Sequence, residues 1–448
     1  MRFVPLAVAG VTALALTACT AGAPKNAPPT LGAQQPSASA SASLPPTTLE
    51  LWHGFSTEAE LKAFTDVVAG FKTKFPQITV KLRKGVQDEN ITQAIRSGKV
   101  PDVAASFTTD NVAQWCKTGA FQDLTQVIKQ DGIDLSVIPQ VARDYTEYNG
   151  VRCMMPLLTD AYGFYYNKGL MKGEQPPKTL SELTALAKKL TVRDPDGTIK
   201  VAGFIPSFTY YENTPAHMAP MVGAKWLNPD GTSAIGTDPA WKTLLKWQKD
   251  LVDWYGFANL EKFRKGLGDE WSADHPFFKG KVAMVIDGEW RTAMIANDSK
   301  AKSLDYGTAP MPVADDKPDL HGGGFTQGTV IGVPKGAKNP QAAWELVKYL
   351  TTETDSLVTL ANALRNVPTT KAAAESPTLV KDERFQTFLD IFNHPKTVTL
   401  PASINSVFNQ ESFAQFLEAW EKGTVKDLDA GLAGVDKRIN DRLKLSGS

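Results

Sequence analysis

Stretches with strand-like and helix-like spacing of apolar residues alternate along the chain. The segment TTLELWHGF has apolar residues at Leu49 and Leu51 and predicts a short strand. The next segment, TEAELKAFTDVVAGFKTKFP, repeats apolar residues at spacings of three and four, which predicts an amphipathic helix that ends at Pro76. From Leu49 onward the chain therefore begins with a strand followed by a helix.

The same alternation continues through the next segments. We expect a strand at ITVKL, a helix at ENITQAIRSGK, an apolar strand at DVAAS and a helix over residues 110–118. Strands that alternate with helices are typical of parallel sheets joined by crossover helices. This part of the pattern predicts an α/β fold class.

Helices dominate the second part of the pattern. They are expected from TLSELTALAKKL onward and again at residues 341–350 and 410–443, with further strands at KVAMVID and GTVIGVP. The body that begins at Leu49 exceeds the usual size of a single domain. Two lobes are therefore expected.

The first 19 residues have the composition of an export signal. Arg2 supplies a positive charge, and residues 3–16 form a mainly apolar run that is too short to span a bilayer. The tetrapeptide LTAC resembles the bacterial lipobox, in which the cysteine is lipidated and becomes the mature N-terminus, so Cys19 is predicted to carry a lipid. Ordinary signal cleavage that discards Cys19, and an uncleaved anchor, are the alternatives.

Residues 20–48 form a compositionally biased segment. They are mainly Ala, Pro, Ser, Gly, Gln and Thr, with almost no large apolar side chain. Such a segment has nothing to bury, so a disordered tether is predicted. Signal and tether together predict a protein held at the extracellular face of the cell membrane through its lipid anchor alone.

Charge and motif content exclude several function classes. The 48 Lys and Arg residues balance 48 Asp and Glu residues, which leaves no electrostatic case for binding nucleic acid. The five histidines are scattered and lack metal-ligand spacing, and neither a G-x-S-x-G elbow nor a phosphate-binding loop occurs. We therefore expect no metal, no cofactor and no enzymatic activity, although two carboxylates could still form a glycosidase pair.

Two cysteines lie in the body of the chain, Cys116 and Cys153. Export makes a disulfide between them chemically permissible. Two buried free thiols are the alternative, because the sequence does not give the distance between them.

Aromatic residues stand beside predicted turns and strand ends. Ligands of open α/β folds lie outside the carboxyl ends of strands, and flat aromatic faces suit the apolar faces of sugar rings. Core packing is the alternative for each of these side chains. The candidates are His53, Phe55, Tyr210, Tyr211, Trp290 and Phe325.

Six features occur in a characteristic order along the body. They are LWHGF, SGKVPDVAAS, PLLTDAYGFYYNKGLM, FFKGKVAMVIDGEW, GGGFTQGTVIGVPKGAKNPQAAWELVKYL and the helix-rich tail. In this order they resemble the extracellular solute-binding proteins of family 1, the class that includes maltose-binding protein and serves ABC importers. The resemblance covers nearly the whole body.

That resemblance implies a periplasmic-binding-protein-like fold with two α/β lobes, hinge crossings and a ligand cleft. Closure of the lobes around a solute would be the signal read by an ABC importer permease, without any change of a bond in the solute. The family also implies a monomer. The implied division is 49–157 plus 311–362 for the N-terminal lobe and 158–310 plus 363–448 for the C-terminal lobe.

The resemblance also implies which residues face the cleft. Asp160 is the best hydrogen-bonding candidate, because an ionised carboxylate accepts bonds from sugar hydroxyls, and an N-cap or a hinge salt bridge is its alternative. The residues carried over are His53, Phe55, Ser56, Phe107, Thr108, Asp160, Trp290, Gly323, Gly324, Phe325, Arg365 and Asn366.

One departure from the maltose-binding pattern leaves the solute open. The glycines at 322–324 would let backbone N–H groups approach a ligand, which also suits a glycerophosphodiester or a phosphorylated polyol, above all if Arg365 lies nearby. Exposed aromatic faces without a cationic partner would favour a neutral sugar. A receptor for a sugar or oligosaccharide is the main prediction; a receptor for a phosphorylated or peptide-like solute, and a tethered glycan-active enzyme or adhesion protein, are the alternatives.

Overall fold

The computed structural model describes residues 30–31, 44–297 and 301–446. The predicted export signal, Cys19 and most of the predicted tether lie outside these residues. Within the predicted tether, the backbone N–H of Leu31 donates a hydrogen bond to Oε1 of Gln122 at 2.7 Å. None of the described helices is long and apolar enough to cross a membrane.

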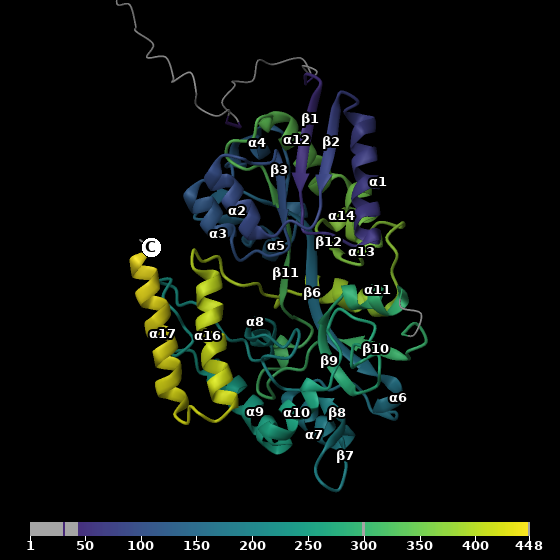
Figure 1. Ribbon diagram of the computed structural model, residues 1–448, viewed down its shortest axis with the longest axis vertical. Helices are drawn as coiled ribbons and strands as arrows, with labels where there is room; N and C mark the ends of the chain where they lie inside the picture. Colours follow the sequence, from purple (N-terminus) through teal and green to yellow (C-terminus); the bar gives the residue numbers. More distant parts are fainter. Residues whose placement is uncertain (1–29, 32–43, 298–300, 447–448) are drawn as a thin grey trace, which may run out of the picture.

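Two halves of the molecule share one long strand, β6 (Met155–Asn167), which runs from the upper half into the lower half of Figure 1. The other described strands are β1 (Thr47–Trp52), β2 (Ile78–Arg83), β3 (Val103–Ser106), β4 (Glu147–Tyr148), β5 (Val151–Arg152), β7 (Val192–Arg193), β8 (Ile199–Phe204), β9 (Val282–Gly288), β10 (Tyr306–Ala309), β11 (Thr326–Gly332) and β12 (Val367–Pro368). In the first half the order is β2-β1-β3-β11-β6, with β1 parallel to β2 and β3, and β11 antiparallel to β3 and β6. In the second half the order continues as β6-β9-β8-β7, and β10 also pairs with β6.

Helices cover this sheet in both halves (Figure 1). Their bounds are α1 (Glu58–Lys74), α2 (Asp88–Ser97), α3 (Val112–Thr118), α4 (Thr125–Gln130), α5 (Gln140–Asp144), α6 (Lys168–Met171), α7 (Leu180–Leu190), α8 (Pro215–Met218), α9 (Pro239–Tyr255), α10 (Phe257–Lys265), α11 (Trp290–Asn297), α12 (Pro340–Thr352), α13 (Thr354–Leu364), α14 (Lys371–Ala374), α15 (Glu383–Asn393), α16 (Ser406–Glu421) and α17 (Leu428–Leu445). The predicted α/β class is confirmed by this alternation of strands and helices.

Local sequence explains the first of these helices. Thr57 caps α1 by accepting a hydrogen bond from the backbone of Glu60, whose carboxylate in turn accepts from the backbone of Thr57. Phe64 and Phe71 lie on one face of α1 and are fully buried. The capping box thus starts the helix where the apolar pattern predicts it, and the apolar face packs it against the core.

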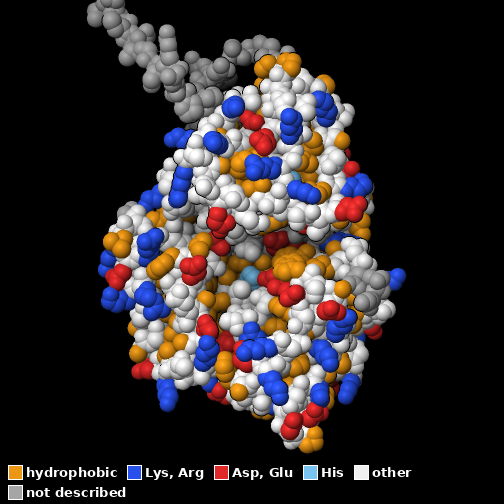
Figure 2. Space-filling model, viewed as in Figure 1, with side chains coloured by type: hydrophobic (Ala, Val, Ile, Leu, Met, Phe, Trp, Pro, Cys, Tyr) orange, Lys and Arg blue, Asp and Glu red, His pale blue; other side chains and the backbone are white. Residues whose placement is uncertain are grey.

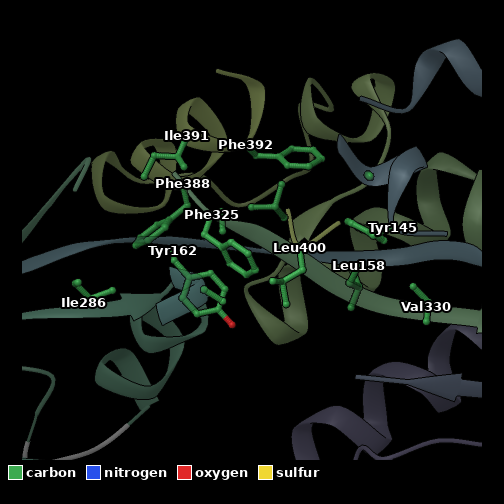
Figure 3. Packing of buried hydrophobic residues seen from close by; sticks show 14 of the residues in the cluster. Tyr145, Leu158, Tyr162, Ile286, Phe325, Val330, Phe388, Ile391, Phe392 and Leu400 are labelled. Carbon is green, nitrogen blue, oxygen red and sulfur yellow. The ribbon is translucent and has the colours of Figure 1, made fainter. Parts of the chain in front are cut away.

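The middle of β6 is packed on both sides by apolar side chains (Figure 3). The hydroxyl of Tyr145 lies 3.0 Å from that of Thr159, and a Cβ at Gly163 would lie 2.7 Å from the ring of Phe388 in α15. Side chains alternate along a strand, and Thr159 and Gly163 lie on one side of β6 while Leu158 and Tyr162 lie on the other, where they are also buried. Asp160, with an even number, lies on the same side of the crossing strand as Leu158 and Tyr162.

A disulfide joins Cys116 in α3 to Cys153, just before β6. Their Cα atoms are 5.3 Å apart, and both residues are buried. The bond ties a helix of the first half to the chain that enters the crossing strand.

Candidate functional site

The face shown in Figure 2 is hollowed where the two halves meet, and carboxylate, histidine and hydrophobic side chains gather in the hollow. The strand β6 crosses between the halves at the same level (Figure 1). The side chains around this crossing therefore form the candidate site.

Three polar side chains form a hydrogen-bonded group at the crossing. Asp160 lies on β6, Glu289 lies between β9 and α11, and Asn366 lies just before β12. Nδ2 of Asn366 donates to Oδ1 of Asp160 at 2.7 Å and to Oε1 of Glu289 at 2.8 Å. The backbone N–H of Ala161 donates to Oε2 of Glu289 at 2.7 Å. We call Asp160, Glu289 and Asn366 the crossing group.

The two carboxyl groups of the crossing group share a hydrogen bond and titrate together. Burial raises the pKa of Asp160 to about 7, although its hydrogen bonds from Asn366 and Glu289 act in the opposite direction. Burial also raises the pKa of Glu289 well above its ordinary value, and the charge of Asp160 raises it further. Near neutral pH the pair therefore keeps a proton that two exposed carboxylates would have lost.

Aromatic rings lie next to the crossing group. Trp290 follows Glu289 directly and begins α11, and its ring meets that of Tyr162 edge-on at a centroid distance of 5.4 Å. Trp271 stacks on Trp290 at 6.1 Å with an interplanar angle of 26°, and Trp271 is 62% exposed. An exposed indole face beside hydrogen-bonding groups suits the apolar face of a sugar ring.

Tyr162 of the crossing strand β6 packs against a residue of the second half. Its ring stacks on His217 at 3.8 Å, and its hydroxyl accepts a hydrogen bond from Nε2 of Gln327 at 2.9 Å. Burial lowers the pKa of His217 to about 4, so this imidazole is neutral at pH 7. The stack therefore adds an aromatic surface to the site without adding a positive charge.

A second set of carboxyl groups lies in the same region. Nε of Arg291 donates to Oδ2 of Asp287 at 2.6 Å, and Nη1 of Arg291 donates to the carbonyl oxygen of Glu270 at 2.9 Å. The carboxyl of Glu270 is hydrogen-bonded to that of Glu212. Burial raises the pKa of Glu212 well above its ordinary value, and the charges of Asp287 and Glu270 raise it further.

A buried carboxylate of α16 positions the loop that carries Tyr210, Tyr211 and Glu212. Glu421 accepts hydrogen bonds from Oγ of Ser207 and from the backbone N–H of Phe208, both at 2.7 Å. The rings of Tyr210 and Tyr211 stack at 4.2 Å on the same loop. The C-terminal helices thus reach the candidate site through this loop.

The family profile described as "Bacterial extracellular solute-binding protein" matches residues 66–387, well over half of the chain. The chain belongs to this family. The predicted resemblance is thereby confirmed, and the absence of catalytic motifs agrees with a family of transport receptors.

Similar proteins support the same assignment for this solute-binding protein. The maltotriose-binding protein of Pyrococcus abyssi is 24% identical over 338 residues, which are 74% of this chain and 68% of that protein. A maltooligosaccharide ABC transporter solute-binding lipoprotein of Streptococcus pneumoniae is 27% identical over 57% of this chain and 56% of its own length. The sn-glycerol-3-phosphate-binding periplasmic protein UgpB of Yersinia pestis is 29% identical over 59% of this chain and 61% of its own length.

Solved structures match the fold of this solute-binding protein over most of its length. A structure of CpMnBP1 with mannotriose bound has a TM-score of 0.75 at 25% identity and covers 87% of this chain and 99% of that chain. The sugar-binding protein MalE of Xanthomonas citri has a TM-score of 0.74 at 17% identity and covers 89% and 98%. The predicted periplasmic-binding-protein-like fold is confirmed by these likenesses.

The structure brings Asp160, Asn366 and Trp290 together, three of the residues that the sequence singles out in this solute-binding protein. Phe325 is fully buried and packs edge-on against Tyr162 at 5.6 Å, so it supports the site from behind. Tyr210 is buried and Tyr211 is partly exposed on the loop that Glu421 positions.

The candidates at the end of β1 and β3 divide into buried and exposed side chains. His53 is fully buried and stacks on Phe64 at 4.8 Å, and burial lowers the pKa of His53 to about 4. Phe55 is buried as well, whereas Phe107 is 41% exposed and packs edge-on against Phe55 at 4.5 Å. Ser56 is exposed and Thr108 is partly exposed. Among these residues Phe107 offers the free aromatic face.

The glycine-rich segment and Arg365 meet other parts of the protein. A Cβ at Gly323 would lie 2.9 Å from the backbone of Lys396, and one at Gly324 would lie 2.9 Å from Cγ2 of Ile391. Nη1 of Arg365 donates to the carbonyl oxygen of Val380 at 3.1 Å. The side chain of Arg365 is therefore bound away from the crossing group, and the glycines admit neighbouring segments of chain, including the backbone of Tyr162, whose oxygen would lie 3.1 Å from a Cβ at Gly324.

Several residues of the site were not singled out in the sequence analysis. Glu289 stands inside the IDGEWR motif, directly before Trp290, and Tyr162 lies two residues after Asp160, so the motifs themselves could have pointed to both. No comparable signal marks His217 or Trp271, because tertiary packing alone brings them to Tyr162 and Trp290.

Proposed function

We propose that this protein captures a sugar or oligosaccharide in the hollow between its two halves and delivers it to the permease of an ABC importer. The exposed Trp271 stacked on Trp290, next to the crossing group, is the observation that supports this most directly. The indole face would contact the apolar face of a sugar ring, while carboxyl and amide groups would bind its hydroxyls. Relatives whose names include maltotriose and maltooligosaccharide support the same solute class.

Binding would act on the hinge between the halves. A solute that touches Phe107 in the first half and Trp290 in the second gains both contacts only when the halves approach each other. The crossing group ties β6 to the segments that begin α11 and β12, so a solute bound there would also contact the crossing segments themselves. No bond of the solute changes in this mechanism.

A phosphorylated solute is the second candidate, and the similarity of the chain to UgpB supports it. A phosphate needs a cationic or N–H-rich partner in the site. Arg365 donates to the carbonyl oxygen of Val380, and Lys396, whose backbone packs on Gly323, pairs with Asp319 at 3.2 Å. Because the charged groups of Arg365 and Lys396 already bind other parts of the protein, a sugar is favoured over a phosphate ester as the solute.

The anchor, the tether and the oligomeric state belong to the same proposal. Cys19 would carry a lipid and residues 20–48 would tether the body, in agreement with the printed name of the streptococcal lipoprotein. The protein would act as a monomer at the extracellular face of the membrane. The lobe boundaries given by the sequence stay a prediction.

The test uses the full chain and its tryptophan fluorescence, because Trp271 and Trp290 lie where the solute would bind. Titration with maltotriose, mannotriose, monosaccharides and glycerophosphodiesters should give a saturable change with a saccharide, and bound saccharide should raise the melting temperature. A response to phosphate esters alone would replace the sugar by the second candidate. Hydrolysis of a bound saccharide would instead favour a glycan-active enzyme.

A further inference from the structure

The candidate site contains more acidic groups than basic ones. The charges of Asp160, Glu289 and Glu212 all act on the buried phenol of Tyr162, so the three carboxyl groups surround one ring. Glu212 in turn is hydrogen-bonded to Glu270, and the charge of Asp287 acts on both. We call these five carboxyl groups, Asp160, Glu212, Glu270, Asp287 and Glu289, the acidic wall.

Among the described residues, Arg291 is the cation that pairs with the acidic wall, while Arg264 lies 6.0 Å from the ring of Tyr210 and pairs with Glu261 outside the wall. Arg291 is fully buried and is committed to Asp287 and to the backbone of Glu270. Among the described residues, no Lys or Arg forms an ion pair with Asp160, Glu289 or Glu212.

The histidines near the acidic wall do not supply the missing charge. Burial lowers the pKa of His217 to about 4, and burial together with the charge of Arg291 lowers the pKa of His275 to about 2. Both rings are therefore neutral at pH 7. Among the described residues, Asp287 and Glu270 are paired with Arg291, whereas Asp160, Glu289 and Glu212 have no Lys or Arg partner.

A second observation points to a ligand at this place. The residue Tyr210 is only 4% exposed, and its hydroxyl has no hydrogen-bond partner among the described residues, although the charges of Asp287 and Glu270 act on it. Nη2 of Arg291 is likewise buried without a hydrogen-bond partner and lies 3.9 Å from Oε1 of Glu270. Buried polar atoms are normally paired, and Nη2 of Arg291 can only donate, so these atoms indicate that a group able to accept a hydrogen bond, such as a sugar hydroxyl, completes this part of the site.

The aromatic side chains add a third observation. The exposed Trp271 stacks on the half-buried Trp290 and has Arg291 at 5.5 Å from its ring, and Tyr162 lies edge-on to Trp290 beside the crossing group. Indole and phenol faces attract cations, and carboxylates accept hydrogen bonds from an ammonium group, which has three donors and no acceptor. Aromatic faces combined with carboxyl groups that have hydrogen-bond partners but no cationic partner, as at Asp160 and Glu289, suit a positively charged ligand.

We propose that the solute is an amine-bearing sugar or oligosaccharide, whose ring lies on Trp271 and Trp290 and whose ammonium group lies against Asp160 and Glu289. This inference rests on the proposed sugar-binding function and names the class of sugar. A phosphorylated sugar would be repelled by the acidic wall, and a neutral sugar would leave its carboxyl groups without a cation.

Binding of an ammonium group would change the protonation of Asp160 and Glu289. Because burial raises the pKa of Asp160 and Glu289, the pair keeps a proton in the empty site near pH 7. An ammonium group favours the ionised form of both carboxyls, so the shared proton passes to the buffer when the solute binds. The amine nitrogen keeps its own proton, and no bond of the sugar changes.

The test compares matched pairs of saccharides by isothermal titration calorimetry on the full chain at pH 6.5. The probes are the β-1,4-linked di- and trisaccharides of glucosamine, the same compounds with N-acetylated amines, and maltotriose. We expect the amine-bearing compounds to bind at least ten times more tightly than their acetylated counterparts. In two buffers of different ionisation enthalpy, the native protein should release about 0.5–1 proton per bound amine, and none with maltotriose.

A variant and its control localise the effect. Glu289→Gln should reduce the preference for the amine to less than about threefold, whereas Asp441→Asn, which changes an exposed carboxylate of α17, should leave the preference intact. The number of protons that the native protein releases per bound amine tests the inference even if Glu289→Gln fails to fold. Equal affinity for amine-bearing and acetylated compounds would overturn this inference but would still agree with the proposed sugar receptor. If no saccharide bound, both the inference and the proposed function would be overturned.

Discussion

The dependence of stability on pH gives a direct test of the crossing group. Burial raises the pKa of Asp160 from 3.8 to about 7, so the folded protein keeps a proton that the unfolded chain releases above about pH 4. A shift of roughly three units corresponds to about 4 kcal/mol at 1.36 kcal/mol per unit, and this is an upper bound because Glu289 shares the proton. For this pair, the free energy of unfolding therefore falls as the pH rises from about 4 to about 7 and is level above that.

The variant Asp160→Asn replaces the titrating carboxyl by a neutral amide. Without solute, we expect it to be more stable than the native protein by about 1–3 kcal/mol at pH 8, and of similar stability at pH 5. A body of roughly 400 residues has an unfolding entropy of about 0.8 kcal/mol/K, so the gain should raise Tm by about 1–4 °C in differential scanning calorimetry. The exposed Asp441→Asn serves as control and should change stability by less than about 1 kcal/mol. Parallel curves of Tm against pH for the native protein and Asp160→Asn would refute the reasoning.

Three further predictions concern the site, the disulfide and the anchor. Trp290→Ala should weaken saccharide binding at least about tenfold in a calorimetric titration, whereas Trp254→Ala, on the exposed face of α9, should not, and equal losses would contradict the stacking role. Cys153→Ser removes a crosslink to Cys116 that spans 37 positions and should lower the free energy of unfolding in urea by about 3–4 kcal/mol; an unchanged midpoint would show that the bond does not stabilise the protein. Cys19→Ala should move the protein from the membrane fraction to the medium, and retention in the membrane would exclude the lipid anchor.

The fold class was predictable because its signals are local. Alternation of strand-like and helix-like apolar spacing is visible within windows of ten to twenty residues, and the capping box of α1 is four residues long. The motif that ends in Trp290 likewise marks the end of β9, because its turn residue Gly288 is the last residue of that strand. Such features need no knowledge of what lies elsewhere in the chain.

The crossing group was only partly predictable for the opposite reason. Asn366 is 206 positions from Asp160 and 77 from Glu289, and no local pattern reports that their side chains meet. The glycines at 322–324 show a related difficulty. A run without side chains admits either a ligand or a neighbouring backbone, and Gly323 meets the backbone of Lys396 in the folded chain.

The position of β11 in the sheet governs the order in which the chain can fold. β11 (Thr326–Gly332) lies between β3 and β6, and its partner residues in those strands precede it by more than 150 positions. During synthesis from the N-terminus, β1, β2 and β3 are therefore complete long before the strand that joins them to β6 exists. The sheet of the second half, with β6, β8 and β9 all in place by Gly288, has its strands earlier. The half that begins first in the sequence is thus the half whose sheet is completed last.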